Sequence, residues 1–413
     1  MRDQNSVNLV ADDAAQGSAP DLTDLWSRMM LSRLARIERG RLTLVTPRRS
    51  VLAFGPPGAE PAVSVAIHNA RLARRLILNG TIGFAESYLD GDWDCPDIVG
   101  LVELAIANER AIGIDVDGHI VLRLVERVRH AMRGNSRRGS ERNISYHYDL
   151  GNAFYAAWLD RTMTYSSALF ADGNEDLAAA QMLKYRAVAQ LLELAPGRSV
   201  LEIGCGWGGF AEYAAREHRS PIVGLTLSRE QHGFAERRLA EAGLAEAATI
   251  RLQDYRDATG VYDRIASIEM IEAVGERNWP TYFTRLRELL APGGIAVLQA
   301  ITIADERFES YRRCPDFIQR HIFPGGMLPS PSAMRKASAR AGLRLTEGPR
   351  FGASYARTLA RWQQRFQAAW PTIAAQGFDR RFKRLWEYYL AYCEAGFRAG
   401  TLDVGLYRLE RAG

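Results

Sequence analysis

After residue 143, apolar residues come in short unbroken runs that are separated by stretches with helical periodicity. The runs lie at 199–203, 221–227, 249–252, 262–268 and 294–301. Strands buried on both faces of a parallel sheet have continuous apolar runs rather than alternating ones. Because these runs alternate with helices, the pattern predicts a doubly wound α/β domain over residues 143–413.

The N-terminal part of the chain has shorter elements. Residues 1–20 are small and polar without periodicity, which predicts a disordered leader. Residues 21–132 mix helical stretches with alternating segments, which predicts a small α/β domain. The expected strands lie at 41–46, 51–54 and 62–68. The glycine- and acid-rich segment 80–94 predicts loop and turn.

Composition places the chain among ordinary globular proteins. Of 413 residues, 47% are hydrophobic and 24% charged, which excludes a disordered or fibrous class. No apolar run approaches the roughly 18 residues of a spanning helix, and the acidic N-terminus differs from a signal peptide. We therefore expect a cytoplasmic protein. The four cysteines have no paired spacing, so we expect neither a disulfide framework nor a metal site.

The chain has a net charge of +5, and its basic residues are almost all arginines, because only Lys184, Lys336 and Lys383 are lysines. Codon bias is one explanation. The other is a phosphate-bearing partner, either nucleic acid or an anionic membrane surface. Residues 133–142, rich in arginine, glycine and serine, are typical of a basic linker between the two domains.

A glycine-rich turn after the first apolar run is the strongest candidate for chemistry. Gly204, Gly206 and Gly209 fit the dinucleotide pattern G-x-G-x-x-G. Glu202 precedes the turn, however, and a carboxylate there suits a positively charged ligand better than a pyrophosphate. Residues 224–228 also lack the acid that binds ribose in NAD enzymes. These features favour an S-adenosylmethionine (SAM) methyltransferase over a dehydrogenase.

Further motifs follow in order, at 145–152, 163–166, 204–209, 224–231, 253–257, 269–275, 321–326 and 388–393. With these motifs the sequence resembles the cyclopropane-fatty-acyl-phospholipid synthases and mycolic acid methyltransferases. The resemblance implies a class I methyltransferase fold, with a mostly parallel seven-stranded sheet and helical C-terminal additions. It also implies one-carbon transfer from SAM to the cis double bond of an unsaturated acyl chain, through a carbocation, to give a cyclopropane.

The resemblance assigns a set of residues to the cofactor. Thr226, Ser228 and Gln231 would replace the missing ribose-binding acid, since hydroxyls and amides also hydrogen-bond a diol. Asp254 or Tyr255 would face the adenine. The full set is Tyr165, Ser166, Glu202, Gly204, Cys205, Gly206, Trp207, Gly208, Thr226, Leu227, Ser228, Gln231, Asp254 and Tyr255.

The resemblance also implies a bicarbonate ion as catalytic base, held by a cysteine, a glutamate, a histidine and a tyrosine. Glu272 and Tyr355 match, whereas Ser167 and Gln299 stand at the cysteine and histidine positions. Serine and glutamine still donate hydrogen bonds to an anion, but the departure leaves a methylene or methyl-branched product as the alternative. Cys393 matches a cysteine treated as an active-site residue, and packing is its alternative role.

The implied partners are unsaturated phospholipids at the inner membrane face, with peripheral association and no nucleic acid. For the N-terminal domain we expect membrane docking or homodimerisation, because basic residues gather at 71–75 and 123–142. Two other functions stay open. One is a methyltransferase acting on RNA or a small molecule, and the other is a non-catalytic lipid-binding protein.

Overall fold

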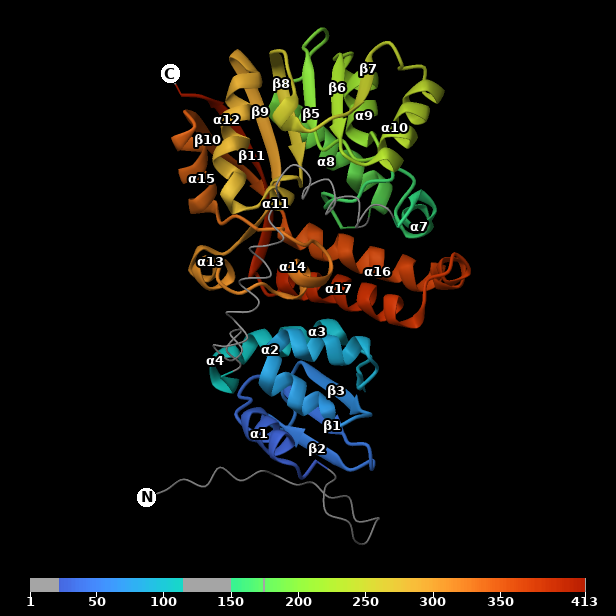
Figure 1. Ribbon diagram of the computed structural model, residues 1–413, viewed down its shortest axis with the longest axis vertical. Coiled ribbons are helices and arrows are strands. Elements are labelled where there is room, and N and C mark those ends of the chain that lie inside the picture. The colour runs from blue at the N-terminus through green and yellow to red at the C-terminus, as the bar shows by residue number, and fades with distance from the viewer. Residues whose placement is uncertain (1–21, 114–149, 174, 413) are drawn as a thin grey trace. The chain divides into compact units, whose positions relative to one another are not determined.

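The computed structural model describes residues 22–113, 150–173 and 175–412. These residues form two compact units (Figure 1). The first contains the described residues up to Gly113 together with 314–317 and 378–399, and the second contains the remainder. The predicted leader 1–20 and linker 133–142 lie outside the described residues.

The second unit is built on a seven-stranded sheet. Its strand order is β10 (Leu343–Arg350), β11 (Leu402–Arg411), β9 (Leu290–Ile303), β8 (Tyr262–Ile268), β5 (Val200–Ile203), β6 (Ile222–Thr226) and β7 (Ala248–Leu252). Strands β9, β8, β5, β6 and β7 pair in parallel, and β11 runs antiparallel to both β9 and β10. The predicted fold class, a mostly parallel seven-stranded sheet with helices, is confirmed.

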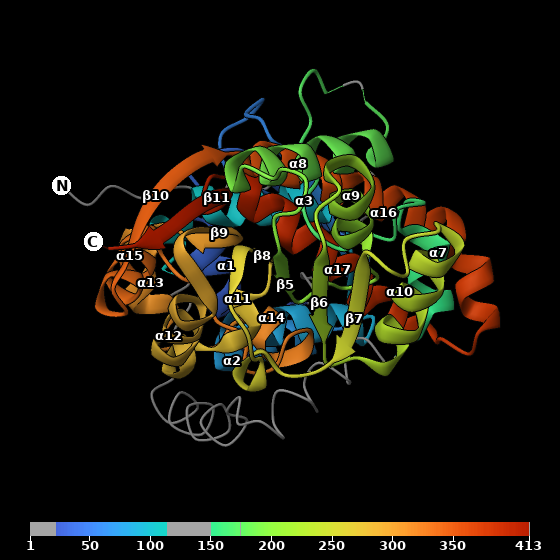
Figure 2. The ribbon, with the colours of Figure 1, turned by 90° about the horizontal axis from the view of Figure 1, so that it is seen from above.

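Helices cover both faces of this sheet. Seen from above, α8 (Leu177–Leu192) and α9 (Gly209–His218) lie on one side and α12 (Trp279–Leu289) on the other (Figure 2). The core consists of fully buried strand residues such as Leu201 and Ile265, packed with Phe283 and Leu286 of α12. The remaining elements of this unit include α7 (Asn152–Trp158), α10 (Arg229–Glu241), η1 (Tyr255–Asp257), α11 (Ile271–Val274), η2 (Glu276–Asn278), α13 (Asp305–Tyr311), α15 (Pro331–Arg340) and α16 (Gly352–Ala375).

The first unit contains a small mixed sheet in the order β2 (Val51–Phe54), β1 (Arg41–Val45), β3 (Ala62–Ile67) and β4 (Trp93–Asp94). Alternate residues of β3 are buried, with Val63, Val65 and Ile67 facing the core, as expected for a sheet with one covered face. Its helices are α1 (Leu25–Leu34), α2 (Arg71–Leu89), α3 (Ile98–Ala107), α4 (Glu109–Ile112) and α17 (Arg380–Arg398). α14 (Phe317–His321) begins in this unit and ends in the other.

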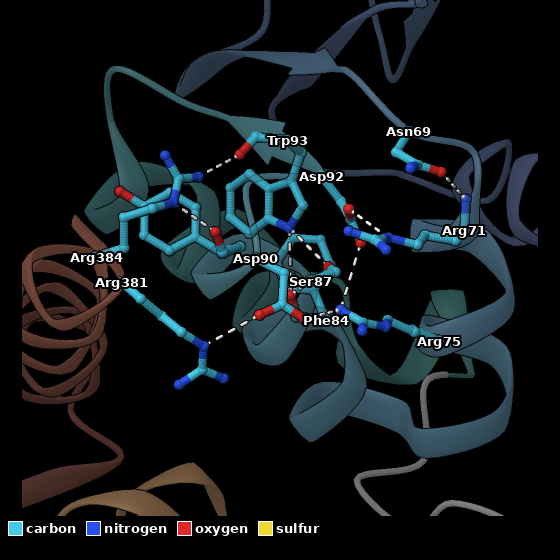
Figure 3. A network of polar contacts seen from close by, with 11 residues as sticks. Asn69, Arg71, Arg75, Phe84, Ser87, Asp90, Asp92, Trp93, Arg381 and Arg384 are labelled. Carbon is cyan, nitrogen blue, oxygen red and sulfur yellow. Dashed lines mark hydrogen bonds and ion pairs between the residues drawn. The ribbon is translucent and has the colours of Figure 1, made fainter. Parts of the chain in front are cut away.

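The loop predicted for residues 80–94 was largely wrong. Helix α2 continues to Leu89, and Gly80 interrupts it with φ 57° and ψ −142°. Glycine tolerates this conformation at little steric cost, so the helix changes direction at Gly80 and then resumes. Beyond the kink, Trp93 donates its indole N–H to Ser87 Oγ at 2.9 Å (Figure 3), which fixes the turn after the helix.

Helix α17 is remote in sequence from the other elements of the first unit, yet it packs on α2 and α3. Arg384 donates to the carbonyl oxygens of Tyr88 and Trp93 and to Asp94 Oδ1, and its guanidinium stacks on the Tyr88 ring at 3.8 Å (Figure 3). This grouping differs from the prediction that 143–413 forms one domain. The cause is tertiary, because the apolar periodicity of α17 does not specify which surface covers it.

Candidate functional site

A pocket lies at the C-terminal ends of the parallel strands in the second unit. It is lined by residues that follow β5, β6 and β8, and it encloses about 1150 Å³ including space open to solvent. Such strand ends are the usual ligand site of open α/β sheets. Twelve of the predicted cofactor residues line it: Tyr165, Ser166, Glu202, Gly204, Cys205, Gly206, Trp207, Thr226, Leu227, Gln231, Asp254 and Tyr255.

The glycine-rich turn has the backbone that its sequence predicts. Gly204, Gly206 and Gly208 all have positive φ, at 82°, 53° and 80°, a region that side chains rarely adopt. A Cβ on Gly204 would lie 2.9 Å from Met270 Cγ. Gly208 is the N-cap of α9, and a Cβ there would lie 3.0 Å from that of Ala235. Gly208 therefore permits helix packing, and it is absent from the pocket lining.

Glu202, at the end of β5, offers the pocket an unused acceptor. Its side chain is 2% exposed, and among the described residues Oε2 has no hydrogen-bond partner. Burial raises the pKa of Glu202 to about 8, and the charges of Lys184 and Arg238 oppose that shift. An orphaned buried acceptor fits a ligand that has hydrogen-bond donors or a positive charge. SAM, the cofactor that the sequence resemblance implies, has both.

The turn after β6 is held by its own side chains. Thr226 Oγ1 donates to Gln231 Oε1 at 2.8 Å, and Ser228 Oγ accepts from the Gln231 N–H at 3.3 Å as the N-cap of α10. Ser228 is 1% exposed and does not line the pocket. Ser228 therefore caps a helix, whereas Thr226 and Gln231 line the pocket.

Asp254 and Tyr255 stand at the pocket wall after β7. Arg256 donates to both carboxylate oxygens of Asp254, with Nε 2.9 Å from Oδ1. The ring of Tyr255 packs edge-on against Tyr282 with centroids 5.5 Å apart, and burial raises the pKa of Tyr255 to about 12. Both side chains are thus held in place before any ligand binds.

Aromatic rings gather beside Tyr165 on another side of the pocket. Its ring centroid lies 5.4 Å from Tyr155, 5.5 Å from Trp158 and 5.2 Å from Trp362. Tyr155 in turn contacts Trp207 at 5.0 Å. Of these rings, Tyr165 and Trp207 line the pocket, and because aromatic faces attract cations, this wall suits a positively charged group.

A carboxylate that sequence reasoning missed lies at the centre of the predicted catalytic residues. Glu269 Oε1 accepts from the Ser167 backbone N–H at 2.8 Å and from Gln299 Nε2 at 2.6 Å. Its Oε2 accepts from the Tyr355 hydroxyl at 2.7 Å. Three of the residues predicted to hold a bicarbonate ion therefore bind a carboxylate of the chain itself, and they leave no vacant donor set for that ion. A carboxylate directly after a buried parallel strand is the signal that could have identified Glu269.

Glu269 also has an unusual backbone. Its φ is +48°, in the left-handed region that glutamate seldom adopts. Strained residues of this kind persist where surrounding contacts over-determine them, and they gather at functional sites. Here the contacts are the three hydrogen bonds to the carboxylate.

Ser167 and Gln299 make hydrogen bonds that differ from the predicted ones. Ser167 Oγ donates to the carbonyl of Ala168 at 2.9 Å, so its backbone N–H rather than its hydroxyl points at the site. Gln299 Nε2 reaches both Glu269 and, at 3.3 Å, the Ser167 carbonyl oxygen. Because the backbone N–H is common to all residues but proline, this position tolerates serine.

Glu272 lies apart from the three donors. Its Oε1 accepts from the Ile301 N–H at 2.6 Å, and among the described residues its buried Oε2 has no partner. Burial and the neighbouring charge of Glu269 raise the pKa of Glu272 to about 8. At neutral pH it is therefore mainly a neutral acid.

Lys184 supplies a buried positive charge near these carboxylates. It is completely buried, and its Nζ donates to Ser166 Oγ at 2.7 Å. Burial lowers the pKa of Lys184 to about 8, against the charges of Glu269, Asp160 and Glu202. Burial raises the pKa of Glu269, and Lys184 counters that effect.

Cys393 is the one predicted catalytic residue that belongs to the first unit, whereas Ser167, Glu272, Gln299 and Tyr355 belong to the second. It lies on α17, in the first unit. Burial and the charge of Asp316 raise the pKa of its thiol, so it is protonated at neutral pH and is a poor nucleophile. Within the described part of the chain, no group of three or more His, Cys, Asp or Glu side chains is arranged to hold a metal.

Comparisons with known proteins agree with this geometry. A family described as mycolic acid cyclopropane synthetase matches residues 135–406. Tuberculostearic acid methyltransferase UfaA1 of Mycobacterium tuberculosis is 41% identical over 365 residues, which covers 86% of this chain and 85% of the relative. Cyclopropane-fatty-acyl-phospholipid synthase of Escherichia coli is 36% identical and covers 84% of this chain and 87% of its own.

A solved structure is also similar. Mycolic acid cyclopropane synthase CmaA1, complexed with SAH and CTAB, superposes with a TM-score of 0.61 at 30% identity, covering 66% of this chain and 98% of its own. SAH is the product that remains when SAM has given up its methyl group. The family match over residues 135–406 includes all the residues that line the pocket.

Proposed function

Because the chain belongs to the mycolic acid cyclopropane synthetase family of SAM-dependent methyltransferases, we propose that its substrate is an unsaturated phospholipid. Family membership establishes methyl transfer from SAM to lipid acyl chains. The finer proposal is that the methyl group goes to a cis double bond and that the product is a cyclopropane. The observation that carries it is the buried carboxylate cluster next to an aromatic wall, since ring closure needs both a base and a shielded cation.

SAM supplies an electrophilic methyl group to this site. Glu202 would offer its orphaned side-chain oxygen to the donors of the methionine part, and the glycine turn would let the backbone approach closely. Asp254 and Tyr255 line the pocket, on the side that the sequence resemblance assigns to the adenosine. These residues bind and orient, which converts a bimolecular encounter into a reaction within one complex.

The aromatic wall has the second task. An alkene that gains a methyl group leaves a positive charge in the acyl chain, and water would trap it. The ring of Tyr165, which lines the pocket, would stabilise such a charge by about 0.5–2 kcal/mol, and the rings of Trp158 and Trp362 pack against it. They also exclude water, because they pack closely on one another.

The test is the mass and structure of the lipid product. We expect lipids from cells that express the protein to contain acyl chains heavier by one carbon and two hydrogens. Nuclear magnetic resonance of the purified product distinguishes the ring from a methylene group. Cells expressing Glu202→Ala, which removes the buried acceptor, serve as the matched control and should show little product. An unchanged lipid profile with an ample SAM supply would refute the proposal.

A methyl-branched or methylene product is the second candidate. Ser167 and Gln299 depart from the family pattern, and one relative is named a tuberculostearic acid methyltransferase rather than a cyclopropane synthase. The same carbocation gives the ring or the methylene chain by losing different protons, whereas a methyl-branched chain also needs a hydride from a separate reductant. The mass and structure of the product distinguish the three.

We further propose that the enzyme visits the inner membrane surface from the cytoplasm. Its net charge of +5 favours anionic headgroups, and none of the helices among the described residues has the length and apolar character to cross a bilayer. Arg71 and Arg75 contribute little to this attraction, because Asp92 and Asp90 pair with them (Figure 3). Segment 123–142 lies outside the described residues. Flotation with anionic vesicles should show binding that weakens as salt increases, and salt-independent binding would argue against the proposal.

A further inference from the structure

The donors that the family resemblance assigns to a bicarbonate ion are occupied by the chain's own carboxylate. We propose that Glu269 is the general base that removes a proton from the carbocation, and that this enzyme needs no bicarbonate. The proposal rests on the proposed function, because it assigns a role in that reaction.

The hydrogen bonds leave Glu269 able to accept one more proton. An ionised carboxylate has about four lone-pair sites, and three are used by Ser167 N–H, Gln299 Nε2 and Tyr355 OH. All three partners donate, so they stabilise the anionic form and fix its orientation. Glu269 also lines the pocket next to Met270 and Ala273, where the reacting groups would lie.

A bicarbonate ion and Glu269 would compete for the same donors. The Ser167 N–H and the Tyr355 hydroxyl each have a single hydrogen to give, and Glu269 already accepts both. A second anion at this point would also lie against the Glu269 charge. The site therefore fits the side-chain carboxylate and does not fit the ion.

The electrostatic setting suits a base. Burial raises the pKa of Glu269, while Lys184 and the three donors oppose the rise. The carboxylate is then more basic than an exposed glutamate but retains stabilisation of its charge. The strained φ of +48° supports the same conclusion, because its cost is offset only when the carboxylate reaches these donors.

Methyl transfer comes first and ring closure second. The π electrons of the acyl double bond form a C–C bond to the methyl carbon, the C–S bond breaks, and its electrons stay on sulfur. The neighbouring acyl carbon becomes a cation. Glu269 then takes a proton from the transferred methyl group, and the electrons of that C–H bond close the three-membered ring. The protonated Glu269 returns its proton to solvent after product release.

The test combines two variants at one position. Glu269→Gln keeps the shape of the side chain but cannot act as a base, so we expect turnover to fall by about 10²–10⁴-fold with or without bicarbonate. Glu269→Gly relaxes the positive φ and empties the donor set. We expect it to be equally slow in bicarbonate-free buffer and to regain activity as bicarbonate or formate is added.

The wild-type enzyme should turn over at the same rate in bicarbonate-free and bicarbonate-containing buffer. Calorimetric SAM binding by both variants verifies that the cofactor pocket is folded. Bicarbonate-dependent wild-type turnover, or a Glu269→Gln variant within about tenfold of the wild type, would overturn the assignment of the base alone. A wild-type enzyme that methylates no unsaturated phospholipid would instead refute the proposed function, and the base assignment with it.

Discussion

At the residue scale, the site combines residues whose roles follow from local sequence with residues whose roles do not. The positive φ of Gly204 and Gly206 is what a strand–turn–helix glycine pattern predicts. The orphaned oxygen of Glu202 follows from its place at a strand end. The partners of Glu269 could not be predicted, because the hydrogen bonds join residues that are 102, 30 and 86 positions apart.

A substitution at Tyr355 tests how the hydrogen bonds to Glu269 affect the charge of its carboxylate. Its hydroxyl stabilises the charged form of Glu269, so Tyr355→Phe should raise the pKa of Glu269. We expect kcat/KM at neutral pH to fall and to recover as the pH is raised. The pH profile of kcat/KM measures this, and SAM affinity should not change. A profile reduced equally at every pH would show that Tyr355 has only a packing role.

Glu272 predicts a pH dependence of stability. The pKa of Glu272 is about 8 in the folded protein and 4.5 when unperturbed. The folded state therefore holds the proton over a pH range in which the unfolded state releases it. The contribution of Glu272 to stability is full below about pH 4.5 and is lost as the pH rises through about 8.

Glu272→Gln should remove much of this dependence. Glutamine resembles the neutral acid and keeps an oxygen to accept from the Ile301 N–H. Thermal denaturation at pH 6 and pH 9 is the measurement, and the wild type should lose more stability than the variant on going to alkaline pH. Equal losses would mean that other groups dominate the alkaline transition.

At the scale of elements, the strands that carry the pocket were predicted to within a few residues, because a buried parallel strand needs a continuous apolar run. Strands β5, β6, β7 and β8 illustrate this. The path of α2 beyond Gly80 and the partner of α17 were not predicted. A glycine with positive φ often ends a helix, so the sequence around Gly80 did not indicate that α2 continues to Leu89.

The attachment of α17 can be measured with two arginines on one helix. The Arg384 side chain is 8% exposed and binds two backbone carbonyls and Asp94, whereas Arg381 is 55% exposed and binds Asp90 (Figure 3). Arg384→Met leaves buried acceptors unsatisfied and should cost about 2–4 kcal/mol of unfolding free energy. Arg381→Met, the control, should cost less than about 1 kcal/mol.

Urea denaturation of both full-length variants gives the comparison. The expected order is wild type, then Arg381→Met close below it, then Arg384→Met. If the two variants were equally stable, the buried contacts of Arg384 would contribute no more than an exposed ion pair.

At the scale of the whole molecule, the first unit is assembled from segments far apart in the chain. Tyr388 of α17 contacts Tyr88 with ring centroids 5.7 Å apart, and Phe317 packs on Tyr388 at 4.8 Å. A chain that begins at residue 143 would retain α17 but lose α2 and α3. Tyr388 would then lose part of the apolar surface that covers it.

We therefore expect a 143–413 fragment to self-associate more than the full chain, since newly exposed apolar surface promotes association. Size-exclusion chromatography of both proteins at matched concentrations is the measurement. Calorimetric SAM binding by the fragment shows whether the second unit still folds. A fragment that elutes as the full chain does, scaled for its mass, would show that α17 needs no cover from the first unit.

The sequence by itself determined the five parallel strands of the sheet, the glycine turn, the cofactor and the family, because these depend on local periodicity and on contiguous motifs. Only the tertiary structure decided which carboxylate occupies the catalytic centre and which unit α17 joins. Glu269 directly follows β8, Gln299 lies on β9 and Tyr355 on α16, and they meet Ser167 only after the sheet and its helices pack. Such convergence depends on distances between elements, which no local pattern of residues encodes.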